Sequence, residues 1–252
     1  MSSRRERQLP EGPYEAPQSA SARGKSISEA RSPFPLVYTQ PSMTDPLSDF
    51  SAKELRKLRS MKDPYGVQKF LDDAPYHLAD TAWSPRRVLA EQTAHCMEGA
   101  IFAAAGLRAN GYSPLLLDLE ADHDTDHVLA IFRQHGCWGA VAKSNYAGCR
   151  WREPVHRTLR ELALTYFNLY FNLRRERTLR RFSVPVNLKR FDRQHWMTTD
   201  QPVWFIVYHL FEIKHYPLIT PEMAKTLHRI DERLFDAECL GKAYKNASKI
   251  SE

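Results

Sequence analysis

Cys96, His127 and Asn145 are the residues whose types and order could perform nucleophilic chemistry. A cysteine in the first turn of a helix faces free backbone N–H groups and the positive end of the helix dipole, which stabilise its thiolate. A histidine can take the thiol proton, and a third residue must then fix the imidazole tautomer. The order predicts a nucleophile at Cys96, a base at His127 and an orienting residue near position 145.

The run from His123 to His127 points to a second kind of chemistry, because imidazoles and carboxylates lie close together in HDTDH. Two histidines four residues apart share a face only in a helix, whereas the residues that follow are typical of a strand. We find no third cluster of metal ligands in the sequence. We therefore expect neither a metal site nor a cofactor.

The helix that must position Cys96 is indicated by the segment CMEGAIFAAAGLRANG. Its composition predicts a helix packed on nearly every side and ended by Asn110-Gly111. Three shorter helices are expected before it, starting after Ser51, Asp63 and Ser84.

Three apolar runs after this helix predict strands at 114–120, 126–133 and 137–144. Beyond them, helices are expected over 153–172, 201–213 and 221–238, with a strand over 184–191. Helices, then a strand cluster, then helices predict an α+β fold: a cysteine-bearing helix on a small antiparallel sheet, with extra C-terminal helices.

The turn between the second and third strands decides which residue faces His127. His135-Gly136 predicts a two-residue hairpin turn, so residue 127 is expected to pair with 144. One bulge moves the partner to 145, which leaves both Ser144 and Asn145 within reach. Asparagine is the better orienting residue, since its carbonyl accepts firmly from an imidazole N–H. We therefore predict Asn145 for this role.

Composition separates the chain into a tail and a domain. Residues 1–48 hold 7 of the 16 prolines and few long apolar side chains, which predicts a disordered tail. The domain is expected over 49–252, with a helical C-terminal extension over about 175–252. The sequence has no apolar run of about 18 residues, so we expect no membrane contact, and no secretory signal is recognised. Four irregularly spaced cysteines favour a reduced, cytoplasmic protein.

The net charge of +6 is concentrated between Lys143 and Arg190, where 12 Lys and Arg stand against 3 Asp and Glu. Such a segment could contact nucleic acid, but solvated faces account for most charge runs of this kind. We expect an anionic substrate or partner beside the site rather than nucleic acid. Lys143 and Arg152 are the candidates to hold its carboxylate or phosphate.

The stretch from Ser84 to Asn145 resembles the core of the transglutaminase-like superfamily, which has a papain-like layout. The resemblance is carried by AEQTAHCMEGAIFAAAGLRANGYSPLLLDL, DHVLAIF and CWGAVAKSN. The chain is more closely similar to uncharacterised bacterial transglutaminase-like proteins, in which the pattern extends through Arg152-Glu153-Pro154. Two positions depart from the superfamily, which usually has Asp where Asn145 stands and an aromatic residue where Met97 stands.

The resemblance implies a triad of Cys96, His127 and Asn145. In that layout the cysteine lies at the N-terminus of a helix, and the other two residues lie on adjacent antiparallel strands. It implies an acyl transferase or an amide or peptide hydrolase that acts on a peptide, amide or other acyl substrate. Oxyanion stabilisation is expected from backbone N–H groups, such as that of Cys96, or from the side chain of Gln92. The alternative is a non-enzymatic scaffold of the same fold that binds an anionic partner. The substrate, the choice between hydrolysis and transfer, and the oligomeric state stay open.

Overall fold

The computed structural model describes residues 45–243, so the predicted tail lies outside the described residues except at its end. There, the 3-10 turn η1 (Pro46–Asp49) packs Leu47 into the core. The described residues combine helices with antiparallel strands, which confirms the α+β class.

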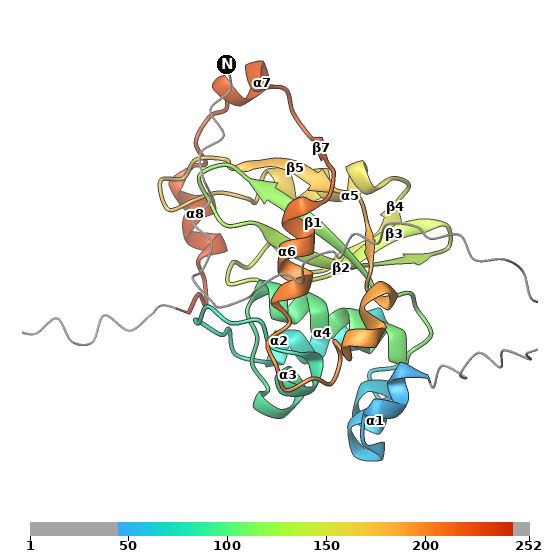
Figure 1. Ribbon diagram of the computed structural model, residues 1–252. Helices are drawn as coiled ribbons and strands as arrows, with labels where there is room; N and C mark the ends of the chain where they lie inside the picture. Colours follow the sequence, from blue (N-terminus) through green and yellow to red (C-terminus); the bar gives the residue numbers. More distant parts are fainter. Residues whose placement is uncertain (1–44, 244–252) are drawn as a thin grey trace, which may run out of the picture. The chain divides into compact units, whose positions relative to one another are not determined.

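One seven-stranded sheet forms the centre of the fold (Figure 1), in the order β4-β3-β2-β1-β5-β7 with β6 paired to β1. Its strands are β1 (Leu115–Ala121), β2 (His127–Gln134), β3 (Cys137–Val141), β4 (Arg152–His156), β5 (Leu179–Ser183), β6 (Val186–Asn187) and β7 (His215–Pro217). Every pairing between them is antiparallel. The strands predicted at 114–120, 126–133 and 137–144 correspond to β1, β2 and β3.

The helices before the sheet start where the capping signals predict. They are α1 (Ala52–Arg59), α2 (Pro64–Asp73), α3 (Pro85–Glu91) and α4 (Cys96–Ala109). The Ser51 hydroxyl accepts from the Glu54 N–H in a capping box, and the Asp63 carboxylate accepts from the Gly66 N–H at 2.8 Å. The remaining helices are η2 (Leu188–Gln194), α5 (Leu159–Phe167), α6 (Trp204–Glu212), α7 (Pro221–Lys225) and α8 (Glu232–Glu238). None of the helices between residues 45 and 243 has the length and apolar character needed to cross a bilayer.

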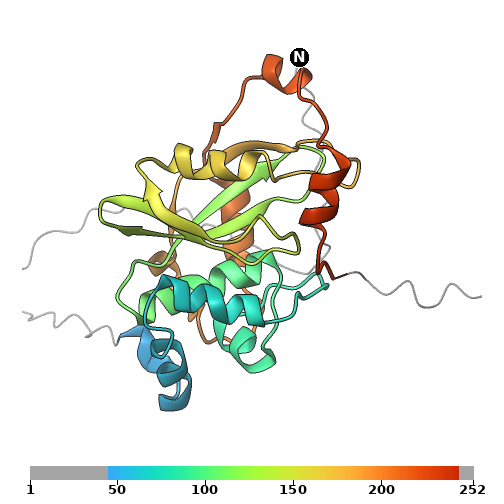
Figure 2. The ribbon, with the colours of Figure 1, turned by 180° about the vertical axis from the view of Figure 1, so that it is seen from behind.

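Two cores lie on the two faces of the sheet, because successive side chains of a strand point to opposite faces. Leu116 and Val128 pack with α4 and α6, whereas Leu117 and Leu129 pack with α5. Figure 2 shows α5 in yellow on one side of the strands and α4 in green on the other. As predicted, α4 is buried on nearly every side, from Glu98 to Leu107.

The helix predicted over 153–172 is wrong at both ends, because α5 covers only Leu159–Phe167. Residues 152–156 form the edge strand β4, in which Arg152 pairs with Ala140 and His156 with Trp138. Pro154 is tolerated there because an edge strand has backbone N–H groups that need no ladder partner. The helix α5 starts only after Thr158, whose hydroxyl caps it.

Two later predictions also need correction. The strand expected over 184–191 is divided between β6 and η2, and β5 precedes it. The helix expected over 221–238 is two short helices, since Asp231 caps a new start by accepting from the Leu234 N–H. Only α6, expected over 201–213, forms as one continuous helix.

Candidate active site

The three predicted residues line one cavity of about 70 Å³. Cys96 is the first residue of α4, His127 is the first residue of β2, and Asn145 lies in the loop after β3. Ser144, the alternative third residue, lines the same cavity. The cavity therefore lies at the start of β2, beside the first residue of α4.

The predicted hairpin register is confirmed. Gln134 pairs with Cys137 across a two-residue turn, and both turn residues have positive φ, 50° at His135 and 79° at Gly136. A type I′ turn requires this geometry and matches the twist of the strands it joins. The ladder runs from Gln134–Cys137 to Ala130–Val141 and ends there, so the pairing predicted between residues 127 and 144 lies beyond it and stays a prediction.

Cys96 is half-buried. The sequence predicted that the helix start would lower the pKa of its thiol, but the surroundings raise it. Burial raises the pKa of Cys96 to about 11, although hydrogen bonds from the Tyr76 hydroxyl and the Met97 N–H lower it. The Asp118 carboxylate adds to the increase. Loss of solvation therefore outweighs the helix N-terminus, and the thiol is protonated at neutral pH.

His127 is buried, and its tautomer is set by a main-chain group. Nε2 lies 2.9 Å from the carbonyl oxygen of Cys149, which can only accept, so Nε2 carries the hydrogen. Nδ1 then holds the lone pair. Burial lowers the pKa of His127 to about 4, against the raising effect of that hydrogen bond. The imidazole is therefore neutral at pH 7 and can accept a proton.

Asn145 makes its hydrogen bonds to the C-terminal segment. Its Nδ2 donates to the Ala243 carbonyl at 2.9 Å, and its Oδ1 accepts from the Ala243 N–H at 2.8 Å. The orienting role of Asn145 stays a prediction, and the Cys149 carbonyl is a second candidate for it. A main-chain carbonyl carries no residue-type signal, so sequence reasoning had no means of finding it.

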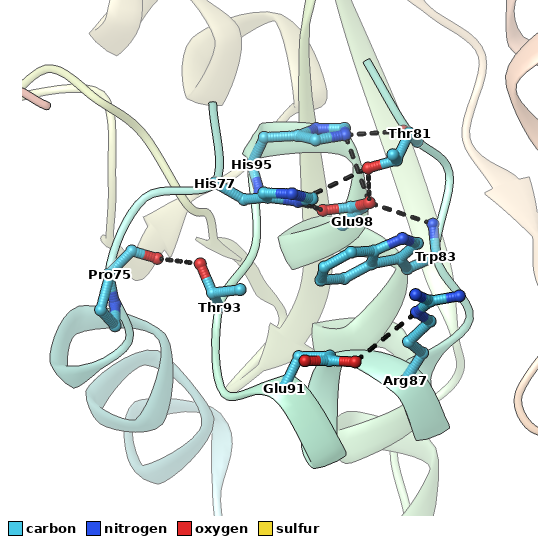
Figure 3. Close-up of polar contacts among 9 residues, drawn as sticks. All are labelled: Pro75, His77, Thr81, Trp83, Arg87, Glu91, Thr93, His95 and Glu98. Atoms are coloured by element: carbon cyan, nitrogen blue, oxygen red, sulfur yellow. Dashed lines mark hydrogen bonds and ion pairs between the residues drawn. The ribbon is translucent and has the colours of Figure 1, made fainter. Parts of the chain in front are cut away.

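We name residues 75–77 and 93–98 the nucleophile wall, because two of them, Tyr76 and Cys96, line the cavity. Figure 3 shows the Glu98 carboxylate, which is buried in the first turn of α4, between His77, Thr81 and Trp83. It accepts from Thr81 Oγ1 at 2.6 Å and from the Trp83 N–H at 3.1 Å, and it lies 3.0 Å from His77 Nδ1. These contacts fix the first turn of α4, and with it Cys96.

We name residues 144–149 the loop wall, because four of them, Ser144, Asn145, Tyr146 and Cys149, line the cavity. Like Asn145, which contacts Ala243, three other residues of this loop contact α8 or the residues just after it. The Glu238 carboxylate accepts from the Gly148 N–H at 2.6 Å, and the Glu238 carbonyl accepts from the Ala147 N–H at 2.9 Å. Lys242 Nζ lies 2.7 Å from the Tyr146 hydroxyl.

The two cations predicted to hold an anionic group make structural contacts instead. The buried Lys143 donates to the carbonyls of Leu71, at 2.5 Å, and Ala74, at the end of α2. Arg152 Nε donates to Thr165 Oγ1 at 2.8 Å on α5. Among the described residues, the cavity lining includes two carboxylates, Asp124 and Asp126, and no lysine or arginine.

Gln92, the side chain considered for the oxyanion, is exposed at the C-terminal end of α3 and lines a separate surface groove. Tyr76 lines the cavity beside Cys96, although nothing in the sequence around it indicated a role. His123 is exposed at the surface, with 70% of its side chain accessible. Between residues 45 and 243 no three His, Cys, Asp or Glu are grouped to hold a metal ion.

No model of a known protein family matches the chain, and no curated protein matches it. The functional interpretation of the cavity therefore depends on its own geometry.

Proposed function

We propose that this protein is a transglutaminase-like, papain-like thiol enzyme that transfers or hydrolyses an acyl group. The observation that carries the proposal is the shared cavity: Cys96 at a helix start and His127 at a strand start line it together. The neutral, tautomerically fixed imidazole adds to this support, because a general base must be unprotonated at the working pH.

The proposed reaction starts from a neutral thiol and a neutral imidazole. The Cys96 proton passes to His127 Nδ1 while the sulfur forms a bond to the acyl carbon, whose C=O electron pair moves to the oxygen. The carbonyl re-forms as the C–N bond breaks, and the departing nitrogen takes the proton from the imidazolium. Water or an amine then attacks the thioester, with the imidazole taking its proton, and releases the Cys96 thiol.

The substrate is proposed to be a peptide, amide or other acyl compound with an uncharged reacting group. An anionic group inside the cavity would meet the carboxylates of Asp124 and Asp126, and their like charge disfavours it. Any anionic part of the substrate or of a partner would therefore lie outside the cavity, where the basic residues are.

The test compares three half-buried cysteines within one chain. Cys137 and Cys239 resemble Cys96 in exposure, so they are internal references for alkylation by iodoacetamide at pH 7, followed by peptide mass mapping. We expect Cys96 to react faster than the references despite the raised pKa of its thiol, because His127 takes the proton as the sulfur attacks. In His127→Gln this advantage should disappear, while the rates at Cys137 and Cys239 stay unchanged.

Equal slow rates at all three cysteines in the wild-type protein would contradict the proposal. The same outcome, together with no thioester after exposure to p-nitrophenyl acetate, would favour the non-enzymatic scaffold.

A further inference from the structure

Tyr76 is held beside Cys96 by a pairing of two chain segments that sequence patterns did not reveal. Tyr76 forms an isolated parallel bridge with Ala94, and the His77 N–H donates to the Ala94 carbonyl at 3.1 Å. Thr93 Oγ1 donates to the Pro75 carbonyl at 2.9 Å, as Figure 3 shows. The segment that carries Tyr76 therefore runs alongside the segment that leads into Cys96.

The neighbours of Tyr76 in this pairing are themselves anchored. His77 contacts the buried Glu98 carboxylate, and His95 Nε2 lies 2.7 Å from the Thr81 carbonyl. Because the residue after Tyr76 and the residue before Cys96 are both fixed, the phenol has a defined place relative to the thiol. Both side chains line the cavity.

The Tyr76 hydroxyl lies near the nucleophile. Tyr76 and Cys96 line the same cavity, and each side chain affects the pKa of the other. Burial raises the pKa of Tyr76 well above its ordinary value, so the hydroxyl keeps its proton throughout the neutral range. A protonated phenol and a backbone N–H therefore converge beside the attacking sulfur.

We propose that Tyr76 is a catalytic residue that donates a hydrogen bond to the oxyanion of the tetrahedral intermediate. This inference rests on the proposed function. When the Cys96 sulfur bonds to the acyl carbon, the electron pair of the C=O bond moves to the carbonyl oxygen, which becomes the oxyanion. The Tyr76 O–H then turns from the sulfur to this oxygen, and the Cys96 N–H donates as the second member of the pair. No proton leaves the phenol, and the bond is released when the carbonyl re-forms.

The experiment separates the oxyanion from the thiol by using two reagents on Tyr76→Phe. Acylation of Cys96 by p-nitrophenyl acetate passes through a tetrahedral intermediate, whereas alkylation by iodoacetamide is a direct displacement and forms no oxyanion. We expect acylation to slow about 100-fold, as when a single oxyanion donor is lost elsewhere, and alkylation to change less than about threefold. Tyr65→Phe, an exposed tyrosine on α2, is the matched control and should leave both rates unchanged.

The outcomes distinguish this inference from the proposed function. Unchanged acylation in Tyr76→Phe, with an active wild-type protein, would overturn the role of Tyr76 alone. Equal losses in acylation and alkylation would also overturn it, since Tyr76 would then act on the thiol. A wild-type protein that forms no thioester would refute the proposed function itself. Tyr76→Gln, which keeps a donor, should acylate faster than Tyr76→Phe, and equal rates would count against hydrogen bonding as the cause.

Discussion

The two walls of the cavity are held in opposite ways. The contacts of the nucleophile wall join residues near in sequence, such as His77 and Glu98, which are 21 positions apart. The contacts of the loop wall include some between distant residues, such as Asn145 and Ala243, which are 98 positions apart, besides the contact of Cys149 with His127, 22 positions away. The nucleophile is therefore positioned by local structure, whereas the wall next to the base depends on closure of the C-terminal segment.

This difference predicts unequal rigidity. The nucleophile wall is centred on a carboxylate with several partners, all inside the fold. The loop wall is held by α8, in which only Glu238 is buried, and segments with few buried contacts open with low free energy. We expect changes in α8 to loosen the base side of the cavity while leaving Cys96 in place.

Glu98→Ala should break the nucleophile wall and have the largest effect. It leaves buried N–H and O–H donors without an acceptor, so we expect a loss of about 4 kcal/mol in the free energy of unfolding. Urea denaturation measures it. Glu91→Ala is the control from the same view (Figure 3): its carboxylate makes only an exposed pair with Arg87 at 3.8 Å, and about 0.3 kcal/mol is expected. Similar losses in both variants would remove the distinction between the walls.

Acidification should act on the base side through His127. Its folded-state pKa of about 4 is lower than its ordinary 6.5, so the unfolded chain binds a proton first. The stabilisation is complete above pH 6.5 and is lost as the pH falls towards 4, by about 3 kcal/mol in total. Urea denaturation at pH 7, 5.5 and 4 measures this loss. His127→Gln should show a shallower decline, and an identical pH dependence in the two proteins would refute the buried neutral imidazole.

Lys143→Met should test the residue that connects the two walls. Lys143 directly precedes the loop wall, and its ammonium group donates to carbonyls at the C-terminal end of α2. Its side chain also packs so closely on Gly99 of α4 that a larger residue there would have no space. Without the ammonium, buried carbonyls lose their donor, and we expect about 2 kcal/mol of destabilisation by thermal or urea unfolding. Lys69→Met, an exposed change on α2, is the control. A stabilised Lys143→Met would mean that the cost of burying the charge exceeds these hydrogen bonds.

Glu238→Ala should produce the smallest global effect, about 1 kcal/mol, by loosening the loop wall. The sharper measurement is hydrogen exchange, which should speed up at the Ala147 and Gly148 amides and stay unchanged at Gly99. Asp236→Ala, on the exposed side of α8, serves as the comparison. Faster exchange at Gly99 would show that the two walls open together.

The sequence predicted the helices and strands that local signals define. The caps at Ser51 and Asp63, the apolar helix α4 and the hairpin turn at His135-Gly136 depend on neighbouring residues, and all were confirmed. The edge strand β4 was missed because its pairing with β3, rather than any propensity around Pro154, makes it a strand.

Predictions for the site followed the same division. Cys96, His127 and Asn145 could be brought to one cavity from residue order and register alone. The direction of the thiol pKa could not, because it depends on burial that only the packed fold determines. The same holds for the Cys149 carbonyl and for Tyr76, whose positions depend on contacts between segments.

The turn at His135-Gly136 affects the cavity at the other end of the hairpin, because the turn sets how β2 and β3 pair. Because strand faces alternate with every residue, an insertion that shifts the register of β3 by one residue, rather than lengthening the turn, would exchange the inner and outer sides of β3. Substitutions at the turn that tolerate positive φ should be harmless, since neither residue touches the cavity. A sequence that keeps Cys96, His127 and Asn145 but shifts this register by one residue would therefore have the three residues on a differently paired sheet.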